Sequence, residues 1–292
     1  MDAIAPALNA ARKVALTSEV KIMSAVQFNT ILVHKSPGVV HIQLNRPDKR
    51  NALSDEMFNE LADAAEAASQ DAELSAIVLS GAGKSFCAGI DFGMFAGFSA
   101  DGDSGQRPFA DPDDPDSTGQ RAPEGGQRIV LALRDAPAVV IAALHGHAIG
   151  AGFEIALGAD IRIVTPEVQL GAPEVQFGMT VDMGASQLLP RLIGSGCATD
   201  LLVTGRRISG ADAFDWGLAS CLSDDPVAEA LKVAQSLSQY SRRAVIETKR
   251  LVRLAETATV KEGMRAELSV MAKNVGSPEQ VAAMQRYFSS KG

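Results

Sequence analysis

The sequence predicts an α/β catalytic domain followed by a helical module at the carboxyl terminus. Short strand patterns recur in the first part of the chain, at residues 28–34, 39–44, 76–80 and 138–144, with helical patterns between them. From Pro226 onward the spacing of apolar residues is helical only. We therefore expect a catalytic domain over residues 26–225 and a helical module over residues 226–292.

Composition limits the functions that the chain can have. The 292 residues are 46% hydrophobic and 21% charged, with a formal net charge of -8, which is ordinary for a globular protein able to bury a core. No basic stripe alternates with aromatic residues, so we expect no nucleic-acid partner. The longest apolar run, 136–144, is too short to cross a bilayer, and we expect no membrane partner. Three widely spaced cysteines, Cys87, Cys197 and Cys221, favour a reducing compartment and a cytoplasmic location.

Two stretches have no packing pattern. Residues 1–25 are alanine-rich and lack the apolar core of a signal peptide, so we expect a disordered extension, with Met23 as a candidate start. Residues 97–127 place several aspartates among prolines and glycines. A solvated mobile loop is favoured there over a functional lid.

The first elements follow from turn and cap signals. Residues 28–34 and 39–44 flank Ser-Pro-Gly, which predicts a two-stranded hairpin. Ser54 can cap a helix whose first turn carries two acids. That helix has an apolar stripe at helical spacing, formed by Met57, Phe58, Leu61, Ala64, Ala65 and Ala68. A buried strand is predicted over 76–80.

The later elements are mostly helices. After a helix at 129–134 and a strand at 138–144, residues 145–174 predict a glycine-rich turn, a short helix, a strand and a loop. A short helix within 208–220 should end at Gly217. Longer helices are predicted at 185–193, 197–204, 227–239, 242–256, 260–274 and 278–288.

Two glycine-rich segments resemble nucleotide-binding loops without matching them. Residues 81–85 read GAGKS, but the position where a phosphate-binding loop needs its first glycine is Val78. Residues 150–152 read GAG, and the third glycine of a dinucleotide fingerprint would fall on Ile155. The sequence therefore argues against an NTPase and against a nicotinamide enzyme.

No metal site is predicted. His145 and His147 could share one face of a strand, yet no acid stands in a ligand pattern with them. We interpret them as a pair of turn histidines. The aspartates of the 97–127 stretch fail the calcium-loop spacing, because Asp116 and Ala122 occupy the glycine and glutamate positions.

Acids beside the glycine-rich turn carry the functional signal. A turn of small residues leading into a helix leaves free backbone N–H groups at a positive dipole end. Glu154 lies in the first turn of that helix, Glu174 at the end of the following loop, and Asp182 further on. Taken singly, each could be a helix-dipole partner or a solvated charge. Together they favour an enzyme that holds an oxyanion while carboxylates move protons.

These residues resemble the crotonase superfamily, the enoyl-CoA hydratase/isomerase family, over residues 28–291. The matching segments are NRPDKRNAL at 45–53, KSFCAGIDF at 84–92, the segment 142–163 around HGHAIGAGFE, the segment 173–194 that opens with PEVQFGMTVDMG, and ADAFDWGLAS at 211–220. The resemblance implies a spiral of ββα units that forms two nearly perpendicular sheets. It also implies a helical carboxyl-terminal module that builds trimers, which often pair into hexamers.

The resemblance also implies the site. An acyl-CoA thioester would be the substrate, with no further cofactor. The backbone N–H groups of Ile90 and Ala151 would stabilise its enolate, and Glu154 and Glu174 would handle water and proton. Coenzyme A would contact a set of residues from the two loops and the carboxyl terminus, namely Lys49, Arg50, Ala52, Ala88, Asp91 and Lys291.

Two departures leave the reaction open. Position 151 is commonly glycine in the family, and position 182 is typically glycine in its hydratases, whereas this chain has Ala151 and Asp182. The family's dienoyl-CoA isomerases carry isoleucine at the position of Ile90 and acids at the positions of Glu154, Glu174 and Asp182, although the first acid is usually aspartate. Our leading hypothesis is hydration of a trans-2-enoyl-CoA. The alternatives are Δ3,5-Δ2,4-dienoyl-CoA isomerisation and a non-catalytic acyl-CoA scaffold. Since three carboxylates in one pocket repel, at least one should have a raised pKa.

Overall fold

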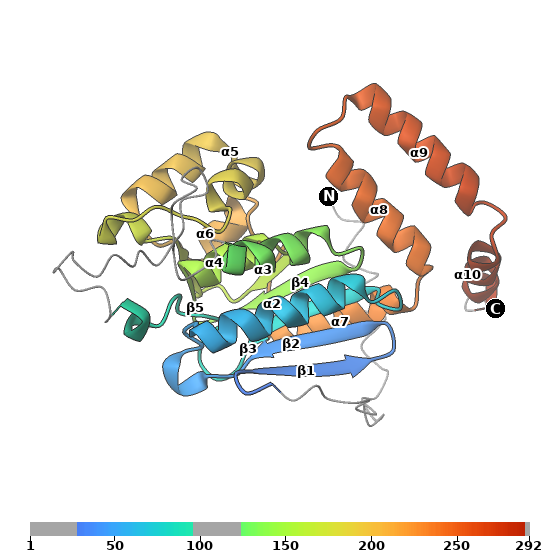
Figure 1. The fold of residues 1–292 in the computed structure, drawn as a ribbon. Coiled ribbons are helices and arrows are strands. Elements are labelled where there is room, and N and C mark those ends of the chain that lie inside the picture. Colours follow the sequence, from blue (N-terminus) through green and yellow to red (C-terminus); the bar gives the residue numbers. More distant parts are fainter. Residues whose placement is uncertain (1–27, 96–123, 290–292) are drawn as a thin grey trace, which may run out of the picture.

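A computed structural model describes residues 28–95 and 124–289 (Figure 1). The extension at 1–25, the aspartate-bearing stretch up to residue 123 and Lys291 lie outside the described residues. One sheet has the strand order β1-β2-β3-β4-β6-β8, and a second pairs β5 with β7. The strands are β1 (Ile31–Ser36), β2 (Val39–Leu44), β3 (Ala76–Gly81), β4 (Val139–Leu144), β5 (His147–Ile149), β6 (Ile161–Val164), β7 (Gln169–Gly171) and β8 (Cys221–Leu222).

The large sheet starts with the predicted hairpin and continues in parallel. Strands β1 and β2 are antiparallel, and the pair Ser36 and Val39 closes a two-residue turn in which Gly38 has a φ of 73°. Strands β2, β3, β4, β6 and β8 then run parallel to their neighbours. Their carboxyl ends meet at one edge of the sheet, where the loops that follow them can come together.

Helices cover both faces of this sheet (Figure 1). On one face Val40, Ile42 and Ile77 join a large core with α2 (Asp55–Gln70), α3 (Glu124–Asp135) and α4 (Ala151–Leu157). On the other face the alternate strand residues, Val39, Val78, Ile141 and Ile163 among them, pack against Ala230 and Ala234 of α7 (Pro226–Ser238). Packing on the sheet thus continues past residue 225, where the sequence pattern placed the domain boundary.

Helix ends agree with the local sequence signals. The Ser54 side chain accepts a hydrogen bond from the Met57 amide at 3.3 Å, which confirms the predicted cap of α2. Helix α5 (Ala185–Thr204) is broken at Gly194, with φ 77° and ψ 156°, so it consists of the two predicted helical segments. Helix α6 (Gly210–Asp215) begins at a capping box.

Several predicted boundaries were wrong. Strand β1 begins at Ile31 and extends to Ser36, whereas the prediction was 28–34. Helix α3 begins at residue 124, inside the predicted loop, because Gly125 and Gly126 weaken the helical signal there.

Three short strands were not predicted at all: β5, inside the segment interpreted as a turn, together with β7 and β8. Two or three residues are too few to show strand alternation, and these strands depend on hydrogen bonds between segments distant in the sequence. His147 is therefore the first residue of a strand, and His145 lies two residues before it.

Helices α8 (Arg242–Leu254), α9 (Val260–Asn274) and α10 (Pro278–Ser289) complete the described chain, and α9 and α10 lie away from the sheet (Figure 1). The bounds of α9 are the predicted ones. Within the described residues no helix has the length and apolar character needed to cross a membrane.

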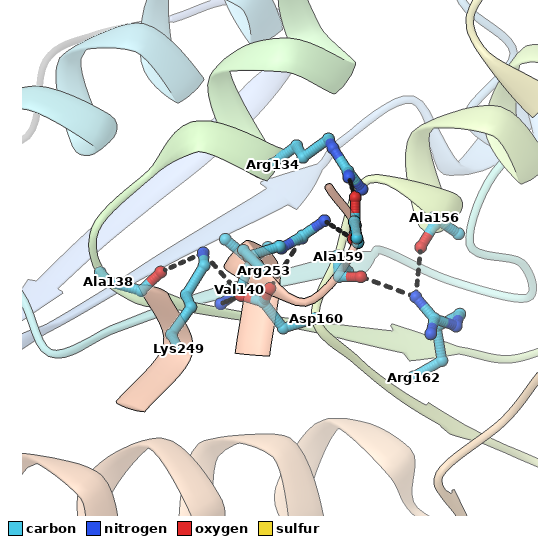
Figure 2. A network of polar contacts seen from close by, with 10 residues as sticks. Arg134, Ala138, Val140, Ala156, Ala159, Asp160, Arg162, Lys249 and Arg253 are labelled. Atoms are coloured by element: carbon cyan, nitrogen blue, oxygen red, sulfur yellow. Dashed lines mark hydrogen bonds and ion pairs between the residues drawn. The ribbon is translucent and has the colours of Figure 1, made fainter. Parts of the chain in front are cut away.

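A buried polar network attaches α8 to the sheet (Figure 2). Asp160, in the loop before β6, accepts a hydrogen bond from the Val140 amide at 2.8 Å. Its carboxylate also forms ion pairs with Lys249 at 2.7 Å and Arg253 at 2.8 Å, both on α8. Lys249 further donates to the carbonyl of Ala138 at 2.8 Å. The Lys249 and Asp160 side chains are only 9% and 16% exposed, so water screens this pair little.

Replacing Asp160 with alanine should lower the free energy of unfolding by about 3 kcal/mol, because two partly buried cations lose their partner. Denaturant unfolding of the purified protein measures this. Lys232→Ala, which removes an exposed ion pair to Glu229, is the matched control and should cost less than about 0.5 kcal/mol. Equal effects of the two substitutions would contradict a role of the network in holding α8.

Candidate active site

Glu154 is buried in α4 and holds the start of α5. Glu154 is only 1% exposed. Its Oε2 accepts hydrogen bonds from the amides of Met183 and Ala185, both at 3.0 Å. The residue before α5 is Gly184, which has no side chain to cap the helix. Glu154 therefore satisfies an amide at the α5 N-terminus from another helix, where a carboxylate is favoured.

Glu174 lies against the turn that opens α4. It is the first residue of a short 3-10 helix, η3 (Glu174–Phe177). A Cβ on Gly150 would lie 2.7 Å from Glu174 Oε1, and Gly150 has φ 55° and ψ -127°, a conformation open only to glycine. Glu174 Oε2 is buried and has no hydrogen-bond partner in the structure. Burial raises the pKa of Glu174, and the charge of Asp182 raises it further.

Asp182 completes the group of acids from the segment before α5. Its backbone carbonyl accepts a hydrogen bond from Gln127 Nε2, on α3, at 2.8 Å. Asp182 is the most exposed of the three acids, yet partial burial of its carboxyl raises its pKa. Gly126 lets α3 approach the same segment, because a Cβ there would lie 2.7 Å from the Met183 side chain. Two helices thus hold the segment that carries Asp182.

The charge of Asp182 acts on both glutamates. Burial raises the pKa of Glu154 to about 7, against the Ala185 amide, which favours the charged form. The charges of Asp182 and Glu174 raise it further. We expected a raised pKa for at least one of the three acids, and the pKa is raised for all three, with burial as the largest cause. Such a group can hold a proton near neutral pH, as an acid/base site requires.

The amides of Ile90 and Ala151 lie on adjoining segments. The Cys87 amide donates to the His147 carbonyl at 2.8 Å, and the Ile149 amide donates to the Cys87 carbonyl at 3.0 Å. Neither the Ile90 nor the Ala151 N–H donates a hydrogen bond to a described residue. Ala151 is the first residue of α4, so its N–H lies at the positive end of the helix dipole.

Close packing of Cys87 brings these two segments together. A Cβ on Gly152 would lie 2.6 Å from the Cys87 Cβ, so only glycine permits this approach. Burial raises the pKa of the Cys87 thiol to about 12, which makes it a packing group and no nucleophile.

The two loops expected to meet coenzyme A run side by side. The Ala88 amide donates to the Arg50 carbonyl at 3.0 Å, and the Leu53 amide donates to the Gly89 carbonyl at 2.8 Å. Lys49 and Arg50 are exposed, whereas Ala52 and Ala88 are partly buried. The structure thus brings together the predicted residues of both loops.

Asp91 lies in one of these two loops, but its carboxylate already has partners within the protein. It forms an ion pair with Arg46 at 2.9 Å and accepts from the Gly93 amide at 3.1 Å. The Arg46 hydrogen bond, followed by the Gly93 amide, holds the pKa of Asp91 below its usual range. Asp91 therefore joins the two loops.

Asn51 is a structural residue of this site that the sequence reasoning missed. It is fully buried, and its Nδ2 donates to the carbonyls of Ala82 at 2.9 Å and Ser85 at 2.8 Å. Its φ of 54° is a left-handed conformation that asparagine tolerates well. An asparagine after a proline-bearing turn was the available signal.

The two histidines of the central segment hold a loop. His145 Nε2 lies 3.0 Å from the Gly83 carbonyl oxygen, and His147 Nδ1 lies 3.0 Å from Ser85 Oγ. Over residues 28–95 and 124–289, no three or more His, Cys, Asp or Glu side chains form a group that could hold a metal ion.

Comparisons with known proteins point in one direction. The family model described as enoyl-CoA hydratase/isomerase matches residues 34–291. A Mycobacterium leprae protein named probable enoyl-CoA hydratase is 33% identical over 268 residues, covering 91% of this chain and 97% of its own. A peroxisomal protein of Arabidopsis thaliana, named Δ(3,5)-Δ(2,4)-dienoyl-CoA isomerase, is 32% identical over 229 residues, covering 77% and 81%. A solved structure from Streptomyces coelicolor, titled putative enoyl-CoA hydratase, has a TM-score of 0.78 at 29% identity, covering 95% and 97%.

The pH dependence of stability should reveal the Glu154 proton. Because burial raises the pKa from 4.5 to about 7, the folded protein keeps a proton that the unfolded chain releases in this interval. That stabilisation, about 3 kcal/mol, is fully present below pH 4.5 and is lost as the pH rises through 7. Glu154→Gln keeps an acceptor for the two amides but cannot titrate. The difference in unfolding free energy between wild type and variant should therefore fall across this window in urea titrations. Parallel curves would contradict the raised pKa.

Proposed function

Because the chain belongs to the enoyl-CoA hydratase/isomerase family, we propose that it hydrates trans-2-enoyl-CoA thioesters to 3-hydroxyacyl-CoA. The observation that carries this proposal is the arrangement of Glu154 and Glu174 beside two backbone amides that donate to no residue of the described chain. The two amides can donate hydrogen bonds to a thioester oxygen, and the two carboxyl groups can bind and deprotonate water. A family of acyl-CoA enzymes supplies the substrate class.

The amides of Ile90 and Ala151 would bind the thioester oxygen. Addition of water to the double bond moves negative charge onto that oxygen as an enolate forms. Two preorganised N–H donors stabilise this charge more than the neutral thioester, each by about 3 kcal/mol, and the dipole of α4 acts in the same sense. The methyl group of Ala151 packs into the core, so alanine preserves the donor.

The two glutamates would then divide the proton work. Glu174 takes a proton from water as the water oxygen bonds to C3, and it returns that proton to C2 on the same face. Glu154 has Oε2 committed to the Met183 and Ala185 amides, so only Oε1 is left to orient the water. The pKa of Glu154, about 7, suits proton transfer near neutral pH, and burial shifts the pKa of Glu174 in the same direction.

Coenzyme A would lie along the paired loops. Lys49 and Arg50 are exposed cations there, and the partly buried Ala52 and Ala88 leave room for an extended ligand. No cofactor besides this substrate-borne group is needed for the reaction. We propose a cytoplasmic location, because free cysteines are typical of proteins in a reducing compartment.

A second reaction has its own supporting observation. Asp182 lies close enough to raise the pKa of both Glu154 and Glu174. In a Δ3,5-Δ2,4-dienoyl-CoA isomerase reaction, Glu174 and Asp182 would shuttle a proton along the acyl chain while Glu154 assists. The relative from Arabidopsis thaliana carries this activity in its name. A non-catalytic acyl-CoA scaffold would have no use for three neighbouring acids with raised pKa values.

We also propose that the chain assembles as a trimer, or as a hexamer of two trimers, through α9. Four apolar side chains spaced three or four residues apart share one side of this helix, and Val275 follows them directly after its last residue. Each is more than half exposed in the single chain: Val260, Met264, Leu268, Met271 and Val275. A continuous apolar stripe of this kind is typical of a subunit contact.

Crotonyl-CoA and a 3,5-dienoyl-CoA offered in parallel test the reaction. Glu174→Gln should lower kcat for hydration by about 1,000-fold, because the group that moves the proton is lost. Asp182→Gly should leave hydration unchanged. If Asp182→Gly abolishes isomerisation of the dienoyl substrate while hydration is unchanged, this result favours the dienoyl-CoA isomerase reaction. A wild-type protein that binds CoA but turns over neither substrate would overturn both reactions and support the scaffold.

Light scattering on a sizing column tests the assembly. Leu268→Glu places a charge in the apolar stripe and should convert the trimer or hexamer to smaller species. Ser269→Glu adds the same carboxylate to another side of α9 and should leave the mass unchanged. Identical masses for wild type and Leu268→Glu would exclude α9 as the contact.

A further inference from the structure

A cluster of cationic and imidazole groups lies beside the loops of the active site. Arg50 follows the 3-10 helix η1 (Pro47–Lys49), His147 begins β5, and Arg207 lies in the segment between α5 and α6. Arg50 and Arg207 are both exposed. Arg207 is not among the site residues named so far.

The second sheet positions Arg207 on the same face as His147. Strands β5 and β7 pair in parallel, and Leu170 of β7 exchanges two 2.9 Å backbone hydrogen bonds with Ile208. Leu170 and Ile208 point into the core, so their neighbours along the chain face the other way. Arg207 therefore shares the outer face with His147. Gly171 permits the close approach, since a Cβ there would lie 3.3 Å from the Arg207 Cα.

The loop 85–88 connects His147 to Arg50 from the other side. Ser85 Oγ lies 3.0 Å from His147 Nδ1, and the Ala88 amide donates to the Arg50 carbonyl. Burial lowers the pKa of His147, and the charges of Arg50 and Arg207 lower it further. Both guanidinium groups are thus near enough to act on one imidazole, although they come from segments more than 150 residues apart.

Arg50 and Arg207 differ from the arginine next to Arg207 in the chain. The adjacent Arg206 forms an ion pair with Asp200 and lies 5.2 Å from the centre of the Trp216 ring. Arg50 and Arg207 form no ion pair with any residue of the described parts of the chain. In a chain with a net charge of -8, two guanidinium groups that have no ion pair within the described residues and act on one imidazole indicate a site for an anion.

We propose that Arg207, together with Arg50 and His147, binds a phosphate of the nucleotide part of the acyl-CoA substrate. This rests on the proposed function. Guanidinium groups bind phosphate through paired N–H donors. The Ser85 hydroxyl can donate to Nδ1 of His147, which leaves the Nε2 proton for the same anion. The ligand group is either the diphosphate or the 3′-phosphate, which share this chemistry.

Truncated substrates separate phosphate binding from every other role. We expect Arg207→Ala to lower kcat/KM for crotonyl-CoA about 10- to 100-fold, through KM, by loss of a charged hydrogen bond. The value for crotonyl-pantetheine, which carries no phosphate of the nucleotide, should not change. Arg206→Ala removes the same charge from the neighbouring position and should affect neither substrate. Arg207→Lys should retain part of the wild-type value, because a lysine keeps the charge and loses the paired donors.

Crotonyl-3′-dephospho-CoA identifies the phosphate. A loss that persists with this substrate assigns the diphosphate, and a loss that disappears assigns the 3′-phosphate; both support the site. Equal losses with crotonyl-CoA and crotonyl-pantetheine, or no loss with crotonyl-CoA, overturn it. Should the wild type turn over no thioester, the proposed reaction fails, and calorimetric titration with free CoA decides. Weaker CoA binding by Arg207→Ala then supports the phosphate site, and unchanged binding overturns it.

Discussion

The carboxylate of Glu154 accepts hydrogen bonds from the amides of Met183 and Ala185, and the arrangement of the candidate active site depends on this contact. It joins the helix that carries the Ala151 amide to the segment that carries Asp182. A buried carboxylate would be costly without such donors, and the α5 N-terminus would have unsatisfied amides without the carboxylate. Each group lowers the cost of burying the other, although burial still raises the pKa of Glu154 to about 7.

The same contact explains why Glu154 and Glu174 differ. Glu154 has one oxygen held by two amides and is almost fully buried, whereas Glu174 has one oxygen beside Gly150 and the other buried without a partner. No donor of the described residues holds Glu174 Oε2, so this oxygen is available to a ligand. Glu174 is therefore the better candidate for a group that gains and loses a proton in each reaction cycle.

Small residues set the distances within the site, and a polar network sets the position of α8. Glycines at 150 and 152 let Glu174 and Cys87 approach the start of α4 more closely than any side chain would allow. At the other end of α4, Arg162 donates to the carbonyls of Ala156 and Ala159 (Figure 2). The loop that follows contains Asp160, which binds α8. One short helix thus lies between the active site and the carboxyl-terminal helices.

Local sequence patterns are enough to predict the helices with long apolar stripes, the Ser54 cap, the break near Gly194 and the carboxylates near the glycine-rich turn. These features depend on residues within a few positions of one another, so periodicity and side-chain chemistry are enough to predict them. Four other features depend on tertiary packing: the short strands β5 and β7, the partners of Glu154, the ion pair between Arg46 and Asp91, and the position of Arg207 beside His147. Each of these joins segments far apart in the chain. Burial, hydrogen-bond partners and pKa values follow from that packing, which no local pattern in the sequence records.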